Sequence, residues 1–508
     1  MIDQIKITSA LISVYSKDGI EEIAKILESH NVRIYSTGGT YDFLLGKGIA
    51  ATSIEAVTSY PSILGGRVKT LHPKVFGGIL WRRDSLSDVK DVEHYDIPSV
   101  DLVIVDLYPF EKTVAGTDNE EEIIEKIDIG GISLIRAAAK NYRHVVVIPS
   151  ADHYKTLMKL LEENNGFSNA EERRYLAAQA FNVSSHYDTQ IFNYFNRKEK
   201  IAAFKQSHII STPMRYGENP HQKGSFYGSL QENFEQIHGK ALSYNNLVDI
   251  DAAINLIAEF REPAVAVIKH TNPCGVACRD SIKDAYLDAL ACDGLSAYGG
   301  IVIANRKIDM ETAGELNKLF FEILLAPEYE KNALEVLKSK KNRIILRSNP
   351  LSFSSSQFKS VLNGVLEQDK DLQAETETDF QFVTKKRPSV AETSELLFAN
   401  KIVKHLKSNT IVISKNKQLI GCGMGQTSRV DAMKQAILKA ATFGFDTNGA
   451  VMASDAFFPF ADSVEIAHEA GISAVIQPGG SIRDADSVKF CDEHDMAMVF
   501  TGIRHFKH

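Results

Sequence analysis

The chain has 508 residues, of which 44% are hydrophobic and 24% are charged, and its formal net charge is −8 at pH 7. This length predicts two to four domains, and the composition excludes disordered, fibrous and repeat classes. The acidic balance supplies no basic field for nucleic acid or an anionic membrane, so a small anionic ligand is favoured.

The sequence carries no signal for export or for membrane insertion. The first residues lack a basic segment followed by an apolar core, and no stretch approaches the roughly 18 apolar residues of a membrane span. The cysteines are few and odd in number, which fits reduced thiols: Cys274, Cys278, Cys292, Cys422 and Cys491. We expect a cytosolic protein without nucleic-acid or membrane partners.

Strands and helices alternate in the first 150 residues. Residues 5–13 predict a buried strand, and Ile20, Ile23, Ala24 and Leu27 lie on one helical face. Further strands are expected at 32–35, 101–107 and 144–148, and helices at 120–127 and 132–140. This alternation predicts a wound α/β sheet.

Composition also predicts the domain boundaries. The segment between Phe195 and Ser211 is polar and basic, so we place the main boundary near residue 200, giving domains 1–200 and 201–508. A serine-rich stretch at 352–356 and an acidic one at 367–379 predict a second break near 350–385, which divides the larger region into two lobes.

Two glycine-containing segments of the first region could hold a phosphate. Ser36-Thr-Gly-Gly-Thr40 follows a predicted strand, where free N–H groups and hydroxyls can bind an anion, although an ordinary turn is equally compatible. In Gly65-Gly-Arg-Val-Lys-Thr-Leu-His-Pro73, Arg67 and Lys69 project to the same side of an extended chain. Two cations beside two glycines favour an anionic substrate over a surface loop.

An acid and an amine flank one predicted helix. Asp128 precedes Gly130-Gly131, and Lys140 ends the same helix. They could serve one site, but taken alone the pattern favours capping and the helix dipole as the explanation of both positions.

The second region contains a strand that ends in Lys269-His270, followed by Thr-Asn-Pro-Cys-Gly275. A cation and an imidazole at a strand end are typical of an acid–base pair, while two exposed turn residues are the alternative. The stretch is similar to the zinc motif of deaminases. We exclude a catalytic zinc because Asn272 replaces the required glutamate and three residues separate Cys274 from Cys278.

Two later segments are ambiguous. Gly421-Cys-Gly-Met-Gly425 lacks the full dinucleotide spacing and follows a predicted hairpin with its turn at 415–417. Arg429 and the aromatic stretch Ser454-Asp-Ala-Phe-Phe-Pro-Phe460 could bind a flat polar ring, or form an aromatic core beside a surface arginine.

Seven motifs in one order make the whole chain resemble the bifunctional AICAR transformylase/IMP cyclohydrolase family. They are residues 65–73, 127–131, 214–222 (Met-Arg-Tyr-Gly-Glu-Asn-Pro-His-Gln), 269–275, 296–300 (Ser-Ala-Tyr-Gly-Gly), 454–460 and 504–508 (Arg-His-Phe-Lys-His).

The resemblance implies a fold and two activities. The fold is α/β, with an N-terminal methylglyoxal-synthase-like wound parallel sheet and two C-terminal cytidine-deaminase-like lobes without zinc. The C-terminal region would transfer a formyl group from 10-formyltetrahydrofolate to AICAR, giving FAICAR and tetrahydrofolate, and the N-terminal domain would cyclise FAICAR to IMP. The family is homodimeric and uses no catalytic metal; a dependence on a monovalent cation stays open.

The resemblance also assigns residues in the first domain. Lys69, Tyr108, Asp128 and Lys140 match cyclohydrolase residues of the family, which overturns the capping explanation for Asp128 and Lys140. The matching nucleotide and phosphate contacts are Lys17, Ser36, Thr40, Arg67 and Thr70. Tyr15-Ser16 stand where some members have Ser-Asp, so phosphate contacts in that loop stay open.

In the second domain, Lys269 and His270 match the catalytic pair of the transformylase. Positions that line the nucleotide and folate pockets of the family match Arg215, Tyr216, Asn246, Asn409, Arg429, Phe457, Pro459 and Arg504.

Two other classes of protein are alternatives to this family. A regulatory module that binds a phosphorylated ligand, fused to a formyltransferase, would not need Asp128 and Lys140. An NAD-dependent oxidoreductase requires a complete glycine-rich fingerprint with a ribose-binding acid, and the sequence has none.

Overall fold

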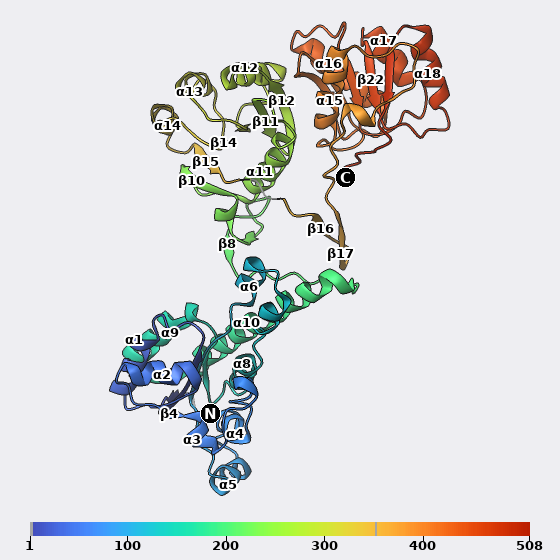
Figure 1. Ribbon diagram of the computed structural model, residues 1–508. Coiled ribbons are helices and arrows are strands. Elements are labelled where there is room, and N and C mark those ends of the chain that lie inside the picture. The colour runs from blue at the N-terminus through green and yellow to red at the C-terminus, as the bar shows by residue number, and fades with distance from the viewer. Residues whose placement is uncertain (1–3, 351–352) are drawn as a thin grey trace. The chain divides into compact units, whose positions relative to one another are not determined.

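The computed structural model describes residues 4–350 and 353–508 (Figure 1). The chain divides into two compact units, Met1–Ile209 and Ile210–His508. The division falls inside the polar segment between Phe195 and Ser211. Ser352, which begins the serine-rich stretch, lies outside the described residues.

A five-stranded parallel sheet forms the centre of the first unit, in the order β4-β3-β2-β5-β6. Its strands are β2 (Ser9–Val14), β3 (Arg33–Ser36), β4 (Thr52–Ser53), β5 (Leu102–Asp106) and β6 (Val146–Ile148). The central strands are apolar because both faces of the sheet are buried. The predicted strand at 5–13 is two strands, since residues 4–6 form β1 (Gln4–Lys6), which pairs antiparallel with β7 (Phe167–Asn169).

Helices surround this sheet. The predicted face of α1 (Ile20–Ser29) is confirmed, because Ile20, Ile23, Ala24 and Leu27 are fully buried. The others are α2 (Gly38–Gly46), α3 (Ile54–Thr58), α4 (Pro73–Leu80), α5 (Leu86–His94), α6 (Phe110–Gly116), α7 (Glu120–Ile124), α8 (Gly130–Lys140), α9 (Tyr154–Glu163) and α10 (Ala170–Glu199).

The second unit contains one twelve-stranded sheet whose strand order is the same in both lobes when each is read outward from the central pair of strands. The order is β10-β15-β14-β13-β11-β12, followed by β20-β19-β21-β22-β23-β18. In the first lobe the strands are β10 (Phe234–His238), β11 (Ala264–Lys269), β12 (Asn272–Cys278), β13 (Ile301–Ala304), β14 (Ile323–Ala326) and β15 (Ile344–Ser348). In the second lobe they are β18 (Gln381–Phe382), β19 (Ile411–Lys415), β20 (Gln418–Gly423), β21 (Val451–Ser454), β22 (Ala474–Gln477) and β23 (Ala497–Phe500).

The helices follow the same duplication. In the first lobe they are α11 (Tyr244–Ile257), α12 (Ile282–Cys292), α13 (Met310–Leu316) and α14 (Lys331–Lys338). In the second they are α15 (Val390–Val403), α16 (Arg429–Thr442), α17 (Asp462–Glu469) and α18 (Asp484–Glu493). Two small hairpins stand outside the sheet: β8 (Ser211–Pro213) with β9 (Ser225–Tyr227), and β16 (Ser356–Val361) with β17 (Gly364–Asp369).

The two lobes share one core. Apolar residues of α11 and α15 pack together on one face of the long sheet, where the rings of Phe260 and Phe398 lie 5.5 Å apart. The opposite face has a separate core in each lobe. The wound parallel sheet of the first unit and the α/β lobes of the second confirm the predicted fold class.

Candidate active site

The carboxyl ends of the central parallel strands bring several sequence-predicted residues of the first unit together. Lys17 follows β2, and its Nζ donates to the Val14 carbonyl and, at 3.2 Å, to Oγ1 of Thr40 in the first turns of α2. Burial lowers the pKa of Lys17, while the charge of Asp106, at the end of β5, opposes this. Parallel α/β sheets bind ligands at this edge.

Glycine lets Lys69 approach the start of α2. A Cβ added at Gly38 would lie 3.1 Å from Nζ of Lys69, and one added at Gly66 would lie 2.9 Å from its Cε. Both glycines have positive φ, 50° and 92°. The Lys69 ammonium therefore lies beside the N-terminal backbone of α2, where an anion would meet a cation and free N–H groups together.

Asp128 lies at the start of α8, where its Oδ1 accepts the N–H of Gly131 at 2.6 Å. The phenol of Tyr187, from α10, accepts the N–H of Asp128 at 2.9 Å. Burial raises the pKa of this carboxyl, and the N–H groups of Gly131 and Tyr108 act in the opposite direction. A carboxyl with a raised pKa can exchange a proton closer to neutral pH.

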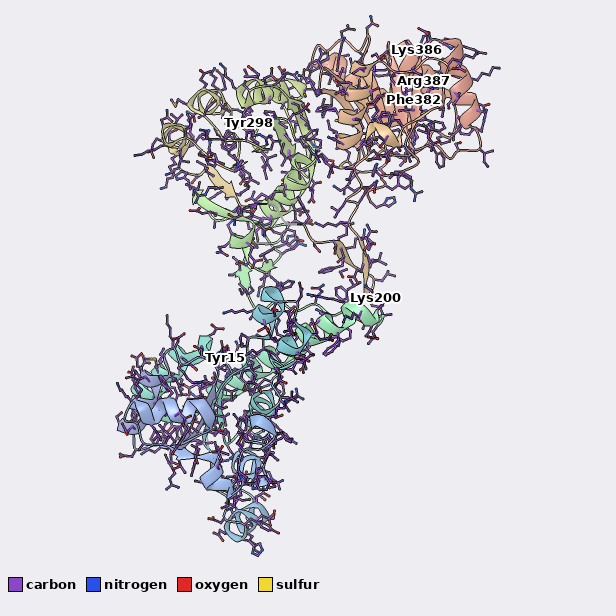
Figure 2. All side chains as sticks on the ribbon, viewed as in Figure 1. Tyr15, Lys200, Tyr298, Phe382, Lys386 and Arg387 are labelled. Atoms are coloured by element: carbon purple, nitrogen blue, oxygen red, sulfur yellow. The ribbon has the colours of Figure 1, made fainter. Side chains whose placement is uncertain are left out.

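Tyr108 lies beside Asp128 and forms an aromatic wall with Tyr15. The two rings are edge to face with centroids 5.6 Å apart, and Nζ of Lys126 lies 5.4 Å from the Tyr15 centroid. Figure 2 labels Tyr15. Burial and the nearby Asp128 raise the pKa of Tyr108, so its phenol stays protonated as a donor.

Three other predicted residues of the first unit have side chains that are buried or already paired. Thr70 is buried with its hydroxyl against Gly130. The hydroxyl of Ser36 is fully buried and donates to the Ile12 carbonyl at 2.8 Å, so any ligand contact there uses the backbone. Arg67 is exposed and pairs with Glu125.

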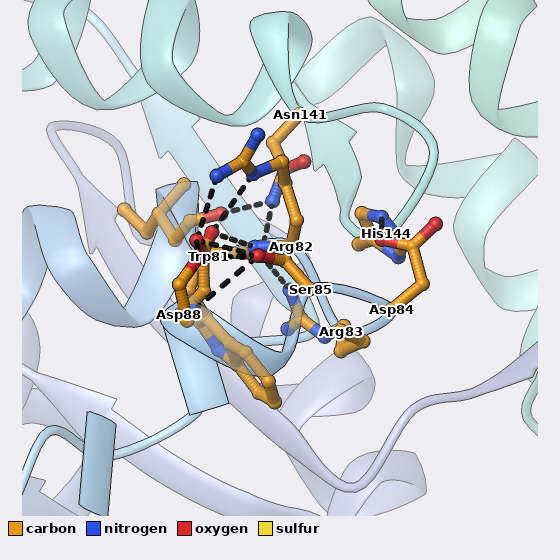
Figure 3. A network of polar contacts seen from close by, with 10 residues as sticks. Trp81, Arg82, Arg83, Asp84, Ser85, Asp88, Asn141 and His144 are labelled. Atoms are coloured by element: carbon orange, nitrogen blue, oxygen red, sulfur yellow. Dashed lines mark hydrogen bonds and ion pairs between the residues drawn. The ribbon is translucent and has the colours of Figure 1, made fainter. Parts of the chain in front are cut away.

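Lys140 is not brought to this cluster within the chain. It is exposed and ends α8, roughly 15 Å along the helix from Gly130. The neighbouring Asn141 belongs to a separate polar network, where its amide donates to the carbonyls of Ile79 at 2.7 Å and Trp81 at 3.0 Å (Figure 3). This network anchors the end of α8 to the segment after α4.

In the second unit, Lys269 and His270 lie at the tight turn between β11 and β12. Lys269 pairs with Asn272, so His270 and Thr271 form a two-residue turn, with φ of 52° and 64°. Two positive φ values are typical of a type I′ hairpin. Nζ of Lys269 donates to the Tyr298 carbonyl at 2.9 Å.

Arg429 is the centre of a buried polar cluster in the second lobe. Its NH1 lies 3.0 Å from Oδ1 of Asn409 and 3.2 Å from Oδ1 of Asp455, and its Nε donates to the Phe457 carbonyl at 2.8 Å. Burial lowers the pKa of Arg429, and Asp455 opposes this. The guanidinium also lies 5.9 Å from the ring of Phe506, which Arg504 faces at 4.3 Å.

The turn at Lys269–His270 and the polar cluster around Arg429 lie at the same end of the twelve-stranded sheet. Strands β12 and β20 are antiparallel, with Ala277 opposite Gln418. The turn at His270 therefore points to the end where the β19–β20 hairpin opens, next to Asn409 and the start of α16 at Arg429.

The other predicted pocket residues of the second unit have local partners. The guanidinium of Arg215 lies over the ring of Tyr216, 4.9 Å from its centroid. Asn246 is buried and closes a capping box with Ser243 at the start of α11, so its side chain is already bonded. Pro459 is exposed.

Sequence reasoning missed Asp106, Asp249 and Asp455. Asp249 accepts the N–H of Thr271 at 2.7 Å, and Asp455 pairs with Arg429. Asp106 and Asp455 each end or follow a buried strand, a signal that was available in the sequence; Asp249 lies inside a helix, where nothing local marks it.

Among residues 4–350 and 353–508, no group of three or more metal-ligating side chains could hold a metal ion. Within the same residues, no helix is long and apolar enough to cross a membrane.

Comparison with known proteins identifies the family. The profile of the AICARFT/IMPCHase bienzyme family matches residues 138–439, and that of the MGS-like domain matches residues 19–133. Similar relatives are named bifunctional purine biosynthesis protein PurH. One from Bacteroides thetaiotaomicron is 57% identical over all of both chains, and one from Chlorobium phaeobacteroides is 48% identical over 99% of each.

The chain belongs to the AICARFT/IMPCHase bienzyme family. It is a bifunctional enzyme of purine biosynthesis, an AICAR formyltransferase and IMP cyclohydrolase that acts on small molecules and uses a folate-type co-substrate. A solved structure entitled "Crystal structure of ForH" is 35% identical and covers 37% of this chain and 99% of its own, with a TM-score of 0.33, too low to inform the fold.

Proposed function

We propose that each unit carries one of the two activities. The second unit transfers the formyl group of 10-formyltetrahydrofolate to the amine of AICAR, and the first closes the ring of the resulting FAICAR to give IMP and water. The observation that supports this best is that each unit has its own group of cationic, acidic and aromatic residues at one end of a buried sheet.

In formyl transfer, the amine of AICAR is a poor nucleophile because the neighbouring carboxamide withdraws electron density. His270 removes a proton from the amine as its nitrogen bonds to the formyl carbon. Lys269 stabilises the oxyanion of the tetrahedral intermediate, which collapses as His270 returns the proton to the leaving nitrogen of tetrahydrofolate. Arg429, Asn409 and Arg504 supply polar groups that can hold the nucleotide or the folate.

In ring closure, the carboxamide nitrogen of FAICAR attacks the formyl carbon and water leaves. Asp128 exchanges the proton, because its raised pKa keeps it nearer to the operating pH. Tyr108 donates a hydrogen bond to the formyl oxygen, and Lys69 with Lys17 holds the phosphate beside α2. These steps use no catalytic metal ion.

We further propose that the protein is a cytosolic homodimer. Lys140 lies away from the Asp128 cluster, so it takes part in ring closure only when a second copy presents it. An apolar surface beside Lys269 supports a dimer independently, as argued in the Discussion.

The two-site assignment predicts that the activities are separable by single substitutions. His270→Asn should lower the kcat of formyl transfer at least ~100-fold and leave ring closure unchanged, and Asp128→Asn should do the reverse, because general acid–base groups contribute about this much. Purified protein is given 10-formyltetrahydrofolate and AICAR, then FAICAR alone, and tetrahydrofolate and IMP are quantified separately.

Each variant is the control for the other, and circular dichroism establishes that both are folded. A folded variant that loses both activities contradicts the two-site assignment. If the wild-type protein forms tetrahydrofolate but never IMP, the first unit is a binding module instead of a cyclohydrolase.

A further inference from the structure

The turn that carries His270 is built from residues that disfavour its backbone conformation. Neither His270 nor Thr271 is glycine, yet φ is 52° and 64°, and Thr271 is β-branched. Positive φ is rare for such residues and persists only where the surroundings hold it. Something outside the hairpin must therefore stabilise this turn.

The carboxylate of Asp249 is that partner. Its Oδ1 accepts the N–H of Thr271 at 2.7 Å, and the backbone N–H of His270 also favours its charged form. Burial raises the pKa of Asp249, whereas the charge of the His270 ring acts in the opposite direction. Asp249 comes from α11, so this helix fixes the turn from outside the hairpin.

The second lobe contains a matched arrangement. The turn of the β19–β20 hairpin is Asn416-Lys417, with φ of 55° and 52°, between the paired residues Lys415 and Gln418. Oε2 of Glu395, from α15, accepts the N–H of Lys417 at 2.7 Å. An acid on the preceding helix therefore holds the hairpin turn in both lobes.

The two acids occupy equivalent helix positions. Asp249 comes six residues after Ser243, which caps α11, and Glu395 comes six residues after Ser389, which caps α15. Both serines belong to capping boxes, with Asn246 and Glu392 as partners. The equivalence identifies the acid-to-turn bond as a feature of the lobe, independent of the chemistry.

The lysines before the two turns differ. Lys415 is bonded to the carboxylate of Asp446 and to the carbonyl of Asn448, at 3.3 and 2.6 Å, so it serves the structure of its lobe. Lys269 donates to the Tyr298 carbonyl at the sheet end that faces Asn409. Only the first hairpin presents its turn toward the proposed transferase site.

We propose that Asp249 is a positioning residue for formyl transfer, which fixes the strained turn at His270–Thr271 and so directs His270 and Lys269 at the reacting groups. This inference rests on the proposed function, since it assumes that His270 and Lys269 act in the transfer. Asp249 acts through the turn, because its Oδ1 accepts the backbone N–H of Thr271. Glu395 has the same structural role in the second lobe but no catalytic role.

The test compares Asp249→Ala with Glu395→Ala in the full-length enzyme. Both remove an acid that holds a hairpin turn, so both should lower the unfolding midpoint. Only Asp249→Ala should lower the kcat of formyl transfer, on the order of 100-fold, with the KM of AICAR and of the folate little changed, since misplacing a reacting group affects the transition state more than binding. Ring closure should be unchanged in both.

Asp249→Glu and Asp249→Asn refine the test. Glutamate, the residue used in the second lobe, should restore kcat to within about tenfold of the wild type, while asparagine, whose neutral amide oxygen accepts the N–H of Thr271 more weakly than a carboxylate, should restore less. Equal loss of kcat in Asp249→Ala and Glu395→Ala, or full activity of Asp249→Ala, overturns the inference. If His270→Asn retains formyl transfer, the proposed function fails first, whatever the Asp249 variants do.

Discussion

A buried histidine ties the C-terminal segment to the segment before the second lobe. The Nδ1 of His505 lies 2.6 Å from Oδ2 of Asp371, and its Nε2 lies 2.6 Å from Oε1 of Glu375. The side chain is 2% exposed. Its two carboxylate partners outweigh burial and raise the pKa of His505 to about 9. The neighbours Arg504 and Phe506 depend on this anchor for their place beside Arg429.

His505 therefore predicts a pH-dependent stability for the second unit. Because the pKa of His505 is higher in the folded protein than in the unfolded chain, protonation of His505 stabilises the fold. This contribution is fully present below the unfolded pKa near 6.5 and disappears as pH rises through about 9. The shift corresponds to roughly 3 kcal/mol. Denaturant unfolding between pH 6.5 and 9.5 should show this loss in the wild type and a much flatter profile in His505→Gln; parallel profiles would contradict the assignment.

At the scale of elements, the β11–β12 hairpin packs on α12 and the β19–β20 hairpin packs on α16, in each case through a glycine. Gly275 of β12 lies against α12, and a Cβ there would overlap the carbonyl oxygen of Ala289. Gly421 of β20 lies against α16 in the same way, with the carbonyl of Ala436 as its neighbour. The close approach of helix and strand therefore requires glycine in both lobes.

Gly275→Ala should destabilise the second unit by roughly 1–3 kcal/mol, because the added methyl group has no space and the helix must move. Formyl transfer should fall at elevated temperature before ring closure does. The measurement is the unfolding midpoint followed by residual activity of each kind. Gly364→Ala, in the exposed β17 strand with no atom within 4 Å of its added Cβ, is the control and should change neither.

At the scale of the whole molecule, the described residues of the second unit leave an apolar surface beside Lys269 uncovered. Leu295, Tyr298 and Phe320 are 80%, 60% and 56% exposed, and the last two rings lie 5.0 Å apart. Figure 2 labels Tyr298 on the first lobe. Neighbouring exposed aromatic residues are typical of protein interfaces. A second copy of the chain that covers this surface would also lie next to the proposed transferase site.

Sedimentation equilibrium should therefore give twice the chain mass of 56.3 kDa for the wild type. Tyr298→Glu combined with Phe320→Glu should give the monomer mass and lower formyl transfer more than ring closure, because the charges cannot be buried. Leu86→Glu changes a more exposed apolar residue in the first unit and should remain dimeric. A monomeric wild-type protein would contradict the proposal.

The sequence predicted elements best where burial is uniform. The face of α1 follows from apolar periodicity, and the strands β2, β5 and β6 follow from continuous apolar runs, because a strand buried on both faces is apolar throughout. The break between β1 and β2 was missed, since Thr8, between the two strands, donates through its N–H and its hydroxyl to Asp101, a residue far along the chain. A local sequence pattern contains no information about a partner so far along the chain.

The family motifs by themselves determined the class of enzyme, its two reactions and the residue types available for them, because the two reactions require acid–base and cationic groups of these kinds. Only the tertiary structure decided which side chains are free to act. It bonded Ser36 and Asn246 to the backbone, separated Lys140 from Asp128, and placed Asp249 under the turn at His270. The bonds of Ser36 to Ile12 and of Asp249 to Thr271 join residues more than 20 positions apart, and only the packing of helices on the two sheets brings them together.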